Sequence, residues 1–279
     1  MNRKISNTSA LSLVIVGILL SAGTTTVRAT EPCGDFGECK VLIEINSTDG
    51  DIGFHFLMDG DDLNSARLHN PNGAKVFEDE AKGPLREQKL TETFAESAEP
   101  PCFEQEPEPG EEAEEFVTLI EFLERWAAGT YVFTGKSDGG EKAEGTTTLS
   151  YKLPAAPKML AFDGSMISWE EGDDLGQCAT KSELDDLVSD STLPMHPMDV
   201  DVVAWEVVFE PEDGSNLKFS IRVPTTAMSV TVPMDYLLSL GDNTPAKIEV
   251  GAIGADDNAT FSEIGDICVN EVEEGCIDD

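Results

Sequence analysis

The sequence predicts an all-β fold made of two β-sandwich-like domains. Short segments that alternate apolar and polar residues follow one another along most of the chain, and this pattern is typical of strands with one buried face. Turn-forming pairs such as Asp-Gly and Asn-Gly separate these segments. The stretch at residues 118–128 stands apart, because it has helical spacing and capping residues. Short strands at this spacing favour antiparallel sandwiches.

Residues 1–29 are expected to be a signal peptide. Arg3 and Lys4 precede an apolar stretch at residues 10–23, and small residues up to Ala29 form a cleavage site. The apolar stretch is shorter than the roughly 20 residues that a membrane-spanning helix needs. We therefore expect cleavage after Ala29 and a secreted or periplasmic protein without a membrane span.

Residues 30–153 are predicted to form an N-terminal β-rich domain. Asp-Gly turns are expected at residues 49–53 and 59–62. Residues 86–97 fit either a helical turn or an extended segment. The strands are expected within residues 40–47, 54–58, 65–73, 74–80, 130–135 and 145–154.

An acidic loop at residues 98–115 interrupts this domain. The loop is rich in Glu, so it is interpreted as a solvated segment, with a cation site as the alternative. Beyond it, Thr118 and Glu121 have the spacing of a capping box, in which each side chain bonds the backbone N–H of the other residue. A helix is therefore predicted near residues 118–128, ending at Gly129.

A second domain is predicted at residues 154–270. It follows a stiff connection of Pro and Ala at residues 153–157. Residues 159–171 contain two expected strands around an Asp-Gly turn. Further strands are expected within residues 202–214, 216–224, 228–233, 246–254 and 258–269. Residues 271–279 are predicted to be an acidic C-terminal tail.

Several motifs of the second domain resemble those of a fibronectin type III domain. They are the entry "LPAAP", "ISWEE" with Trp169, "WEVVF" with Trp205, "VTVP" and "IEVGA". The resemblance implies an immunoglobulin-like sandwich in which both Trp side chains pack between the sheets. The tyrosine-corner position of the family falls on Ala246, and an insertion at residues 170–201 separates the two Trp strands. Residues 30–153 show no such resemblance.

The resemblance also implies a function. Together with the expected signal peptide, it favours an exported, non-catalytic protein with a binding, adhesion or spacer role, whose partner is a protein or glycan outside the cytoplasm. Two alternatives remain open: a carbohydrate-binding accessory protein, and a hydrolase that uses acidic residues of the N-terminal domain. Exposed coplanar aromatic side chains would favour the first, and close carboxylates in a cleft would favour the second.

The six cysteines are predicted to form three disulfides, because an even number of Cys in an exported chain favours oxidation. Many pairings are possible in principle, and only proximity along the chain discriminates between them. Proximity favours the pairs Cys33–Cys39, Cys268–Cys276 and Cys102–Cys178.

The chain is strongly acidic, with 55 Asp and Glu against 18 Lys and Arg and a formal net charge of −37. Such a surface repels nucleic acids and anionic lipids, which excludes both as default partners. It favours solubility, and high salt relieves its self-repulsion. The composition fits a marine or halophilic bacterial source.

The sequence contains little that indicates catalysis. Its three histidines are His55, His69 and His196, and no Gly-x-Ser-x-Gly elbow accompanies them. Alternation places His55 on the face of its strand opposite to that of Phe54 and Phe56, and we expect each of the three to be structural or at the surface. Acidic residues are too numerous for any pair to be singled out. Gly-rich phosphate loops are missing, so no nucleotide cofactor is predicted.

Metal binding has two sets of candidates. The two Asp-Gly turns carry oxygen ligands suited to calcium, but they lack the EF-hand spacing, and Asp-Gly is also ordinary hairpin sequence. These calcium candidates are Asp49, Asp51, Asp59, Asp61 and Asp62. Copper(I) is the weaker candidate, for the soft ligands Met195, His196 and Met198, which fit a Pro-flanked extended loop equally well.

Overall fold

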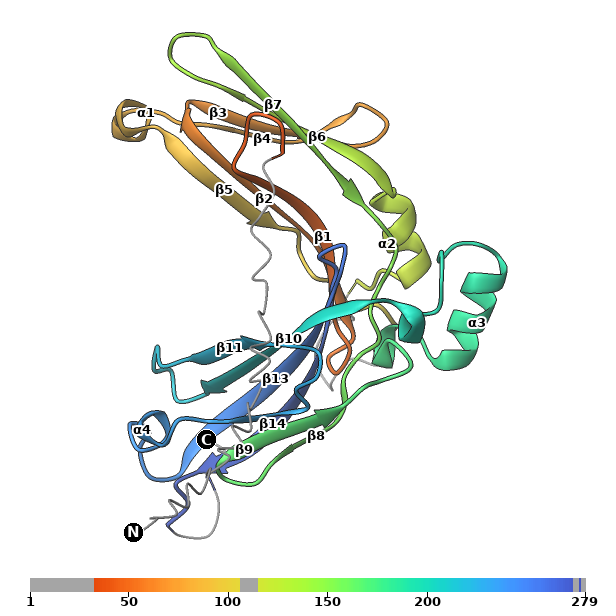
Figure 1. Cartoon of the computed structure of the whole chain (residues 1–279), viewed down its shortest axis with the longest axis vertical. Coiled ribbons are helices and arrows are strands. Elements are labelled where there is room, and N and C mark those ends of the chain that lie inside the picture. The colour runs from red at the N-terminus through yellow and green to blue at the C-terminus, as the bar shows by residue number, and fades with distance from the viewer. Residues whose placement is uncertain (1–32, 106–114, 273–275, 277–279) are drawn as a thin grey trace, which may run out of the picture. The chain divides into compact units, whose positions relative to one another are not determined.

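The computed structural model describes residues 33–105, 115–272 and 276. These residues belong to one compact unit, which covers residues 31–279 (Figure 1). The predicted signal peptide lies outside the described residues, as do the middle of the acidic loop and most of the C-terminal tail. Within the described part, no helix is long and apolar enough to cross a membrane.

The prediction of an all-β fold is confirmed. In the described residues, fourteen strands form sheets of seven, four and three strands. The buried apolar side chains form two separate cores. We call residues 33–153 the N-terminal half and residues 154–272 the C-terminal half. The placement of a domain boundary between them stays a prediction.

The N-terminal half is a sandwich of three strands against four. One layer contains β1 (Glu38–Asn46), β2 (Asp51–Leu63) and β5 (Leu90–Glu96). The other layer has the order β4 (Lys75–Glu80), β3 (Ser65–His69), β6 (Gly129–Lys136) and β7 (Lys142–Leu149). Successive side chains of β1 point to opposite faces of the sheet, so Val41, Ile43 and Ile45 are buried on the same face. Between the layers, the ring of Phe56 lies 6.3 Å from that of Phe133.

The predicted helix is present as α2 (Leu119–Arg125), and so is its capping box. Thr118 Oγ1 accepts a hydrogen bond from the backbone N–H of Glu121 at 3.3 Å, and the Glu121 carboxylate accepts one from the N–H of Thr118 at 3.1 Å. Residues 86–97, predicted as either a helical turn or an extended segment, contain both structures. The short helix α1 (Pro84–Gln88) is followed by β5 after one residue.

Helix α2 ends earlier than predicted. Trp126 is its C-terminal cap, and Gly129 begins β6 instead of ending the helix. The hydroxyl of Tyr151 donates a hydrogen bond to the carbonyl of Leu123 at 2.5 Å. This side chain satisfies one of the carbonyls that a helix end leaves without a partner, so no glycine cap is needed.

The turn predicted at residues 59–62 is wrong. Strand β2 continues to Leu63, with an irregularity in its pairing to β5 after Asp59. A Cβ atom on Gly60 would lie 2.5 Å from the ring of Phe36. The glycine at this position therefore permits close approach of an aromatic ring within a strand, and does not mark a chain reversal.

The C-terminal half repeats the arrangement of three strands against four. Its smaller sheet has the order β12 (Ser229–Thr231), β9 (Met166–Glu170) and β8 (Lys158–Phe162). The facing strands have the order β11 (Phe219–Val223), β10 (Val202–Pro211), β13 (Thr244–Gly254) and β14 (Ala259–Val269). This is the strand order of a fibronectin type III domain, which confirms the fold that the sequence motifs imply.

The same order holds in the N-terminal half, where the sequence showed no resemblance. Counted from its own first strand, each half places strands 1, 2 and 5 in one layer and strands 4, 3, 6 and 7 in the other. The protein therefore contains the fibronectin type III strand order twice.

The core of the C-terminal half contains Trp169 and Trp205, as the resemblance to fibronectin type III implied. Trp169 is 3% exposed and Trp205 is 2% exposed, and their rings meet edge to face at 6.1 Å. Ala246, at the expected tyrosine-corner position, is fully buried in β13. The short helix α4 (Met234–Leu237) provides a different tie, since the hydroxyl of its Tyr236 donates to the carbonyl of Phe209 at 2.9 Å.

The insertion at residues 170–201 packs against the core of the other half. It contains helix α3 (Lys181–Ser189), visible in Figure 1, and two 3-10 turns (Gly176–Cys178 and Pro197–Asp199). Leu175, Leu184 and Leu193 are buried within the N-terminal core. The N-terminal half therefore completes its hydrophobic core with side chains from the C-terminal half.

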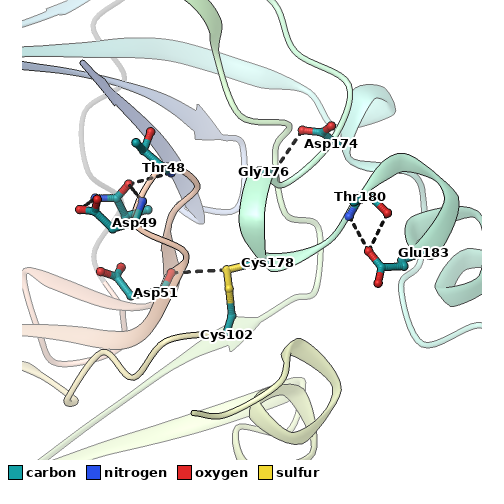
Figure 2. Close-up of a disulfide and its surroundings, with 10 residues drawn as sticks. Thr48, Asp49, Asp51, Cys102, Asp174, Gly176, Cys178, Thr180 and Glu183 are labelled. Carbon is teal, nitrogen blue, oxygen red and sulfur yellow. Dashed lines mark hydrogen bonds between the residues drawn. A yellow bond between two sulfur atoms is a disulfide. The ribbon is translucent and has the colours of Figure 1, made fainter. Parts of the chain in front are cut away.

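The structure contains the three disulfides expected from the sequence. Cys33 pairs with Cys39, and Cys268 pairs with Cys276. The third disulfide joins Cys102 to Cys178, across 76 residues of chain. Figure 2 shows this third bond linking the segment after β5 to the insertion.

The two halves share the seven-stranded sheet. Strand β1 pairs in parallel with β14, so the three-stranded layer of the first half continues into the four-stranded layer of the second. Asn258 is fully buried at this junction. Its Oδ1 accepts from the N–H of Ile43 at 2.8 Å, and its Nδ2 donates to the carbonyls of Ser150 and Lys152 at 2.9 and 3.1 Å. A side chain of the C-terminal half therefore satisfies three backbone groups of the N-terminal half.

Candidate functional site

The candidate site is a groove on the face of the seven-stranded sheet that points away from the two cores. Its volume is about 530 Å³. Side chains from all seven strands line it, because every second residue of each strand faces this side. Strands from both halves contribute, so the groove depends on the pairing of β1 with β14.

Two glycines hollow out the groove. A Cβ atom on Gly53 of β2 would lie 2.6 Å from Oε1 of Glu99 and 2.9 Å from Nε2 of His55. A Cβ atom on Gly251 of β13 would overlap the ring of Phe261. The absence of side chains at these positions leaves space for a polar pair in one half and for an aromatic ring in the other.

A histidine surrounded by carboxylates lies at the N-terminal side of the groove. We call Glu44, His55, Glu96 and Glu99 the His55 cluster. Strand register brings the first three together, because His55 is opposite Glu96 and Glu44 is opposite Gly53. His55 Nε2 lies 2.8 Å from Oε1 of Glu99, and Nδ1 lies 4.0 Å from one oxygen each of Glu44 and Glu96.

Burial and charge shift the protonation of this cluster. Burial of Glu44 raises its pKa to about 7, with the charges of Glu99 and Glu96 adding to the increase and that of His55 opposing it. Burial alone would lower the pKa of His55, but its hydrogen bond to Glu99 and the carboxylates around it outweigh burial and raise the pKa. Both groups therefore hold protons more tightly than in an unfolded chain.

The acids of the other side of the groove have basic partners. Lys247 Nζ lies 2.9 Å from Glu249 and 3.0 Å from Glu263, and these bonds outweigh burial and raise the pKa of Lys247. Arg222 lies 2.7 Å from Glu206. In the described part of the chain, no Lys or Arg lies within ion-pair distance of a carboxylate of the His55 cluster. The two sides of the groove therefore differ in charge balance.

The calcium candidates occupy two separate places. Asp49 lies in the turn before β2, and Asp51 is the first residue of β2 and borders the groove. Burial, together with the charges of Glu99 and Asp49, raises the pKa of Asp51 to about 6. The remaining candidates lie near the other end of β2, and they are Asp59, Asp61 and Asp62. Calcium binding at either place stays a prediction.

The other two histidines lie outside the groove. His69 is half-buried at the end of β3. His196 is buried, and its Nδ1 accepts a hydrogen bond from the N–H of Met198 at 3.4 Å. The sulfur of Met198 accepts from Lys181 at 3.6 Å, while Met195 borders a different, small cavity. Copper binding by this segment stays a prediction.

None of the three tryptophans is an exposed platform for a sugar ring. Trp169 and Trp205 are buried, and Trp126 stacks on Phe54 with ring centroids 4.0 Å apart. The exposed aromatic ring in the groove is that of Phe94, which is 55% exposed and meets His55 edge to face.

The sequence alone did not predict the His55 cluster. Alternation correctly predicts that His55 lies on the face of β2 away from Phe54 and Phe56, but it does not show which carboxylates surround the ring. The register of β1, β2 and β5 is needed to bring Glu44 and Glu96 to this ring, and Glu99 comes from a segment outside any strand. The one usable signal was the glycine two positions before His55.

Comparisons with known proteins support no closer assignment. No family model matches the chain, and no curated protein matches it. Among solved structures, it is similar to a two-domain fibronectin type III segment of chicken tenascin, with 9% identity, a TM-score of 0.25, and coverage of 82% of this chain and 97% of that one. It is also similar to the FN1–FN3 domains of chicken CNTN1, with 11% identity, a TM-score of 0.32, and coverage of 87% and 66%. At these TM-scores the fold assignment rests on the strand order within each half.

Proposed function

We propose that this protein is an exported, non-catalytic module that binds a protein or glycan outside the cytoplasm, or spaces two such partners. The observation that carries the proposal is the junction between the halves. A shared sheet, the buried Asn258 and the Cys102–Cys178 disulfide all connect one sandwich to the other. Such a connection suits a protein that presents a surface of fixed form. Fold alone does not specify a function, so the groove defines where binding is tested.

Export is supported by the three disulfides, which persist in oxidising compartments. The net charge of −37 fits a marine or halophilic source, because ions there screen the repulsion between carboxylates. Cell fractionation and mass spectrometry of the mature protein test this part. We expect a periplasmic or extracellular protein whose first residue is Thr30.

Binding is tested by biolayer interferometry against glycans and purified surface proteins of the producing organism. We expect saturable binding to at least one of them, weakened when Phe94→Ala removes the exposed ring of the groove. Leu238→Ala is the matched control, because it removes an exposed apolar side chain outside the groove. Saturable binding that both variants retain would move the binding surface elsewhere. The absence of any saturable binding would contradict the proposal.

A hydrolase is the second candidate, and Glu44 favours it. A carboxyl group with a pKa of about 7 is suited to general acid catalysis, and the carboxyl groups of Glu96 and Glu99 lie beside it in the groove. Turnover of chromogenic glycosides or esters, abolished by Glu44→Gln and retained by Glu92→Gln, would establish this function in place of the first.

A further inference from the structure

We propose that the His55 cluster binds one divalent transition-metal ion, with Zn²⁺ as the ion that best fits its ligands. The proposed ligands are Glu44, His55 and Glu99, whose nearest ligand atoms all lie within 4.8 Å of one another. Glu96 lies beside the same imidazole. This inference does not depend on the proposed function, since either a binding module or a hydrolase can hold such an ion.

The chemistry of the ligands selects the class of ion. Zn²⁺ binds His nitrogen and Glu oxygen in sites with four ligands. Calcium takes about six to eight oxygen ligands and does not favour imidazole. The cluster offers one imidazole and a small number of carboxylates, which fits the first ion and not the second.

The spacing of the proposed ligand atoms suits one ion. Nε2 of His55 lies 2.8 Å from Oε1 of Glu99, and one ligand atom from each of Glu44, His55 and Glu99 lies within 4.8 Å of the other two. Ligand atoms around a tetrahedral Zn²⁺ lie about 3.3 Å apart when each metal–ligand bond is about 2.0–2.1 Å long. Small movements of these side chains therefore place all three atoms around one ion.

The surroundings of the ring suit a metal ligand. A metal-bound imidazole usually donates its second N–H to a carboxylate, which fixes its orientation. With Glu99 as a ligand the ion lies at Nε2, and the carboxylate of Glu96, 4.0 Å from Nδ1, is placed to orient the ring from its other side. Gly53 leaves open the space beside Glu99 and the imidazole that a Cβ atom would fill.

Charge balance gives an independent reason. Groups of carboxylates in a partly buried place are costly without a cation. The acids on the C-terminal side of the groove have Lys247 and Arg222, whereas those of the His55 cluster have no Lys or Arg partner among the described residues. A bound dication would fill this deficit.

Isothermal titration of the purified, disulfide-bonded protein with Zn²⁺ tests the site. We expect one tight site per chain, which excess Ca²⁺ does not displace. Removing an outer-shell partner of a metal typically weakens binding about 10–100-fold, so we expect His55→Gln and Glu99→Gln, which remove ligands, to weaken it more than about 100-fold. Glu92→Gln is the matched control, because it removes an exposed carboxylate from the same strand as Glu96 and leaves the cluster intact.

A second measurement remains informative if His55→Gln fails to fold. Long-range ¹H–¹⁵N spectra resolve the imidazoles of the three histidines, and we expect equimolar Zn²⁺ to shift the resonances of His55 while those of His69 and His196 stay in place. The proposal is overturned if His55 does not respond. It is overturned equally if Glu99→Gln binds Zn²⁺ as tightly as the unmodified protein, or if Ca²⁺ displaces Zn²⁺ from the site.

Discussion

The two halves of this protein have the same strand order and build their cores in different ways. Every buried residue of the C-terminal core comes from the C-terminal half, with Trp169 and Trp205 at its centre. The N-terminal core is rich in Phe and Leu, and it includes Leu175, Leu184 and Leu193 from the insertion. The same fold is therefore self-contained in one half and dependent on its neighbour in the other. From this difference we expect the N-terminal half to lose its stability without the insertion.

Loss of the disulfide between the halves should have the largest effect. Replacing Cys102 and Cys178 together with Ser removes a bond that closes 76 residues of chain, and the loop-entropy model places the cost at about 4 kcal/mol. The matched control replaces Cys268 and Cys276, which close only 8 residues, with an expected cost of about 2–3 kcal/mol. Urea unfolding measures both free energies. Equal losses would show that the link between the halves adds nothing beyond a local bond.

The second largest loss of stability should come from shortening a side chain of the insertion that is buried in the N-terminal core. Leu184 is fully buried there, so Leu184→Ala should destabilise the protein by about 2–5 kcal/mol. Ser182→Ala on the exposed side of the same helix is the control, and we expect little change from it. A small effect of Leu184→Ala would indicate that the N-terminal core does not need the insertion.

A polar substitution at the junction should cost less. Asn258→Ala leaves the N–H of Ile43 and the carbonyls of Ser150 and Lys152 without this partner. Leaving buried polar groups unsatisfied costs about 1–3 kcal/mol. Asn216→Ala, at an exposed position between β10 and β11, provides the comparison. If Asn258→Ala were as mild as Asn216→Ala, water would replace the lost bonds and the junction would be loosely packed.

The smallest effect concerns the pH dependence of stability. The pKa of Glu44 is about 7 in the folded protein and 4.5 for an ordinary glutamate, so its contribution to the free energy of unfolding is fully present below pH 4.5 and lost as the pH rises through 7. Glu44→Gln cannot titrate. The stability of the unmodified protein should therefore fall relative to this variant between pH 4.5 and 7, as measured by urea unfolding at several pH values. Parallel pH profiles would contradict the raised pKa.

The contrast between the halves also explains what the sequence could predict. Alternation and turn residues are local, so nearly every strand was found from the sequence, and the capping box located α2. The C-terminal half was recognised because its Trp residues lie in the core of a self-contained sandwich. The N-terminal half has no such marker, and part of its core lies in a distant insertion. A single-sequence pattern contains no information on that contact.

The groove is less predictable for a similar reason. Alternation correctly placed His55 on the face opposite Phe54, but its partners come from two other strands and from the segment that contains Glu99. Which of the many carboxylates surround it depends on strand register and on the space above Gly53. The Asp-Gly pairs were more visible in the sequence, yet the Asp candidates around them lie near opposite ends of β2.

Native-state hydrogen exchange in rising urea tests the central claim most directly, because it reports separately on each half. We expect amides of β6 in the N-terminal half and β13 in the C-terminal half to exchange with the same opening free energy and the same urea dependence, since both open only when the whole unit unfolds. If β6 exchanged at a distinctly lower free energy while β13 remained protected, the halves would unfold independently and the shared sheet would not join them.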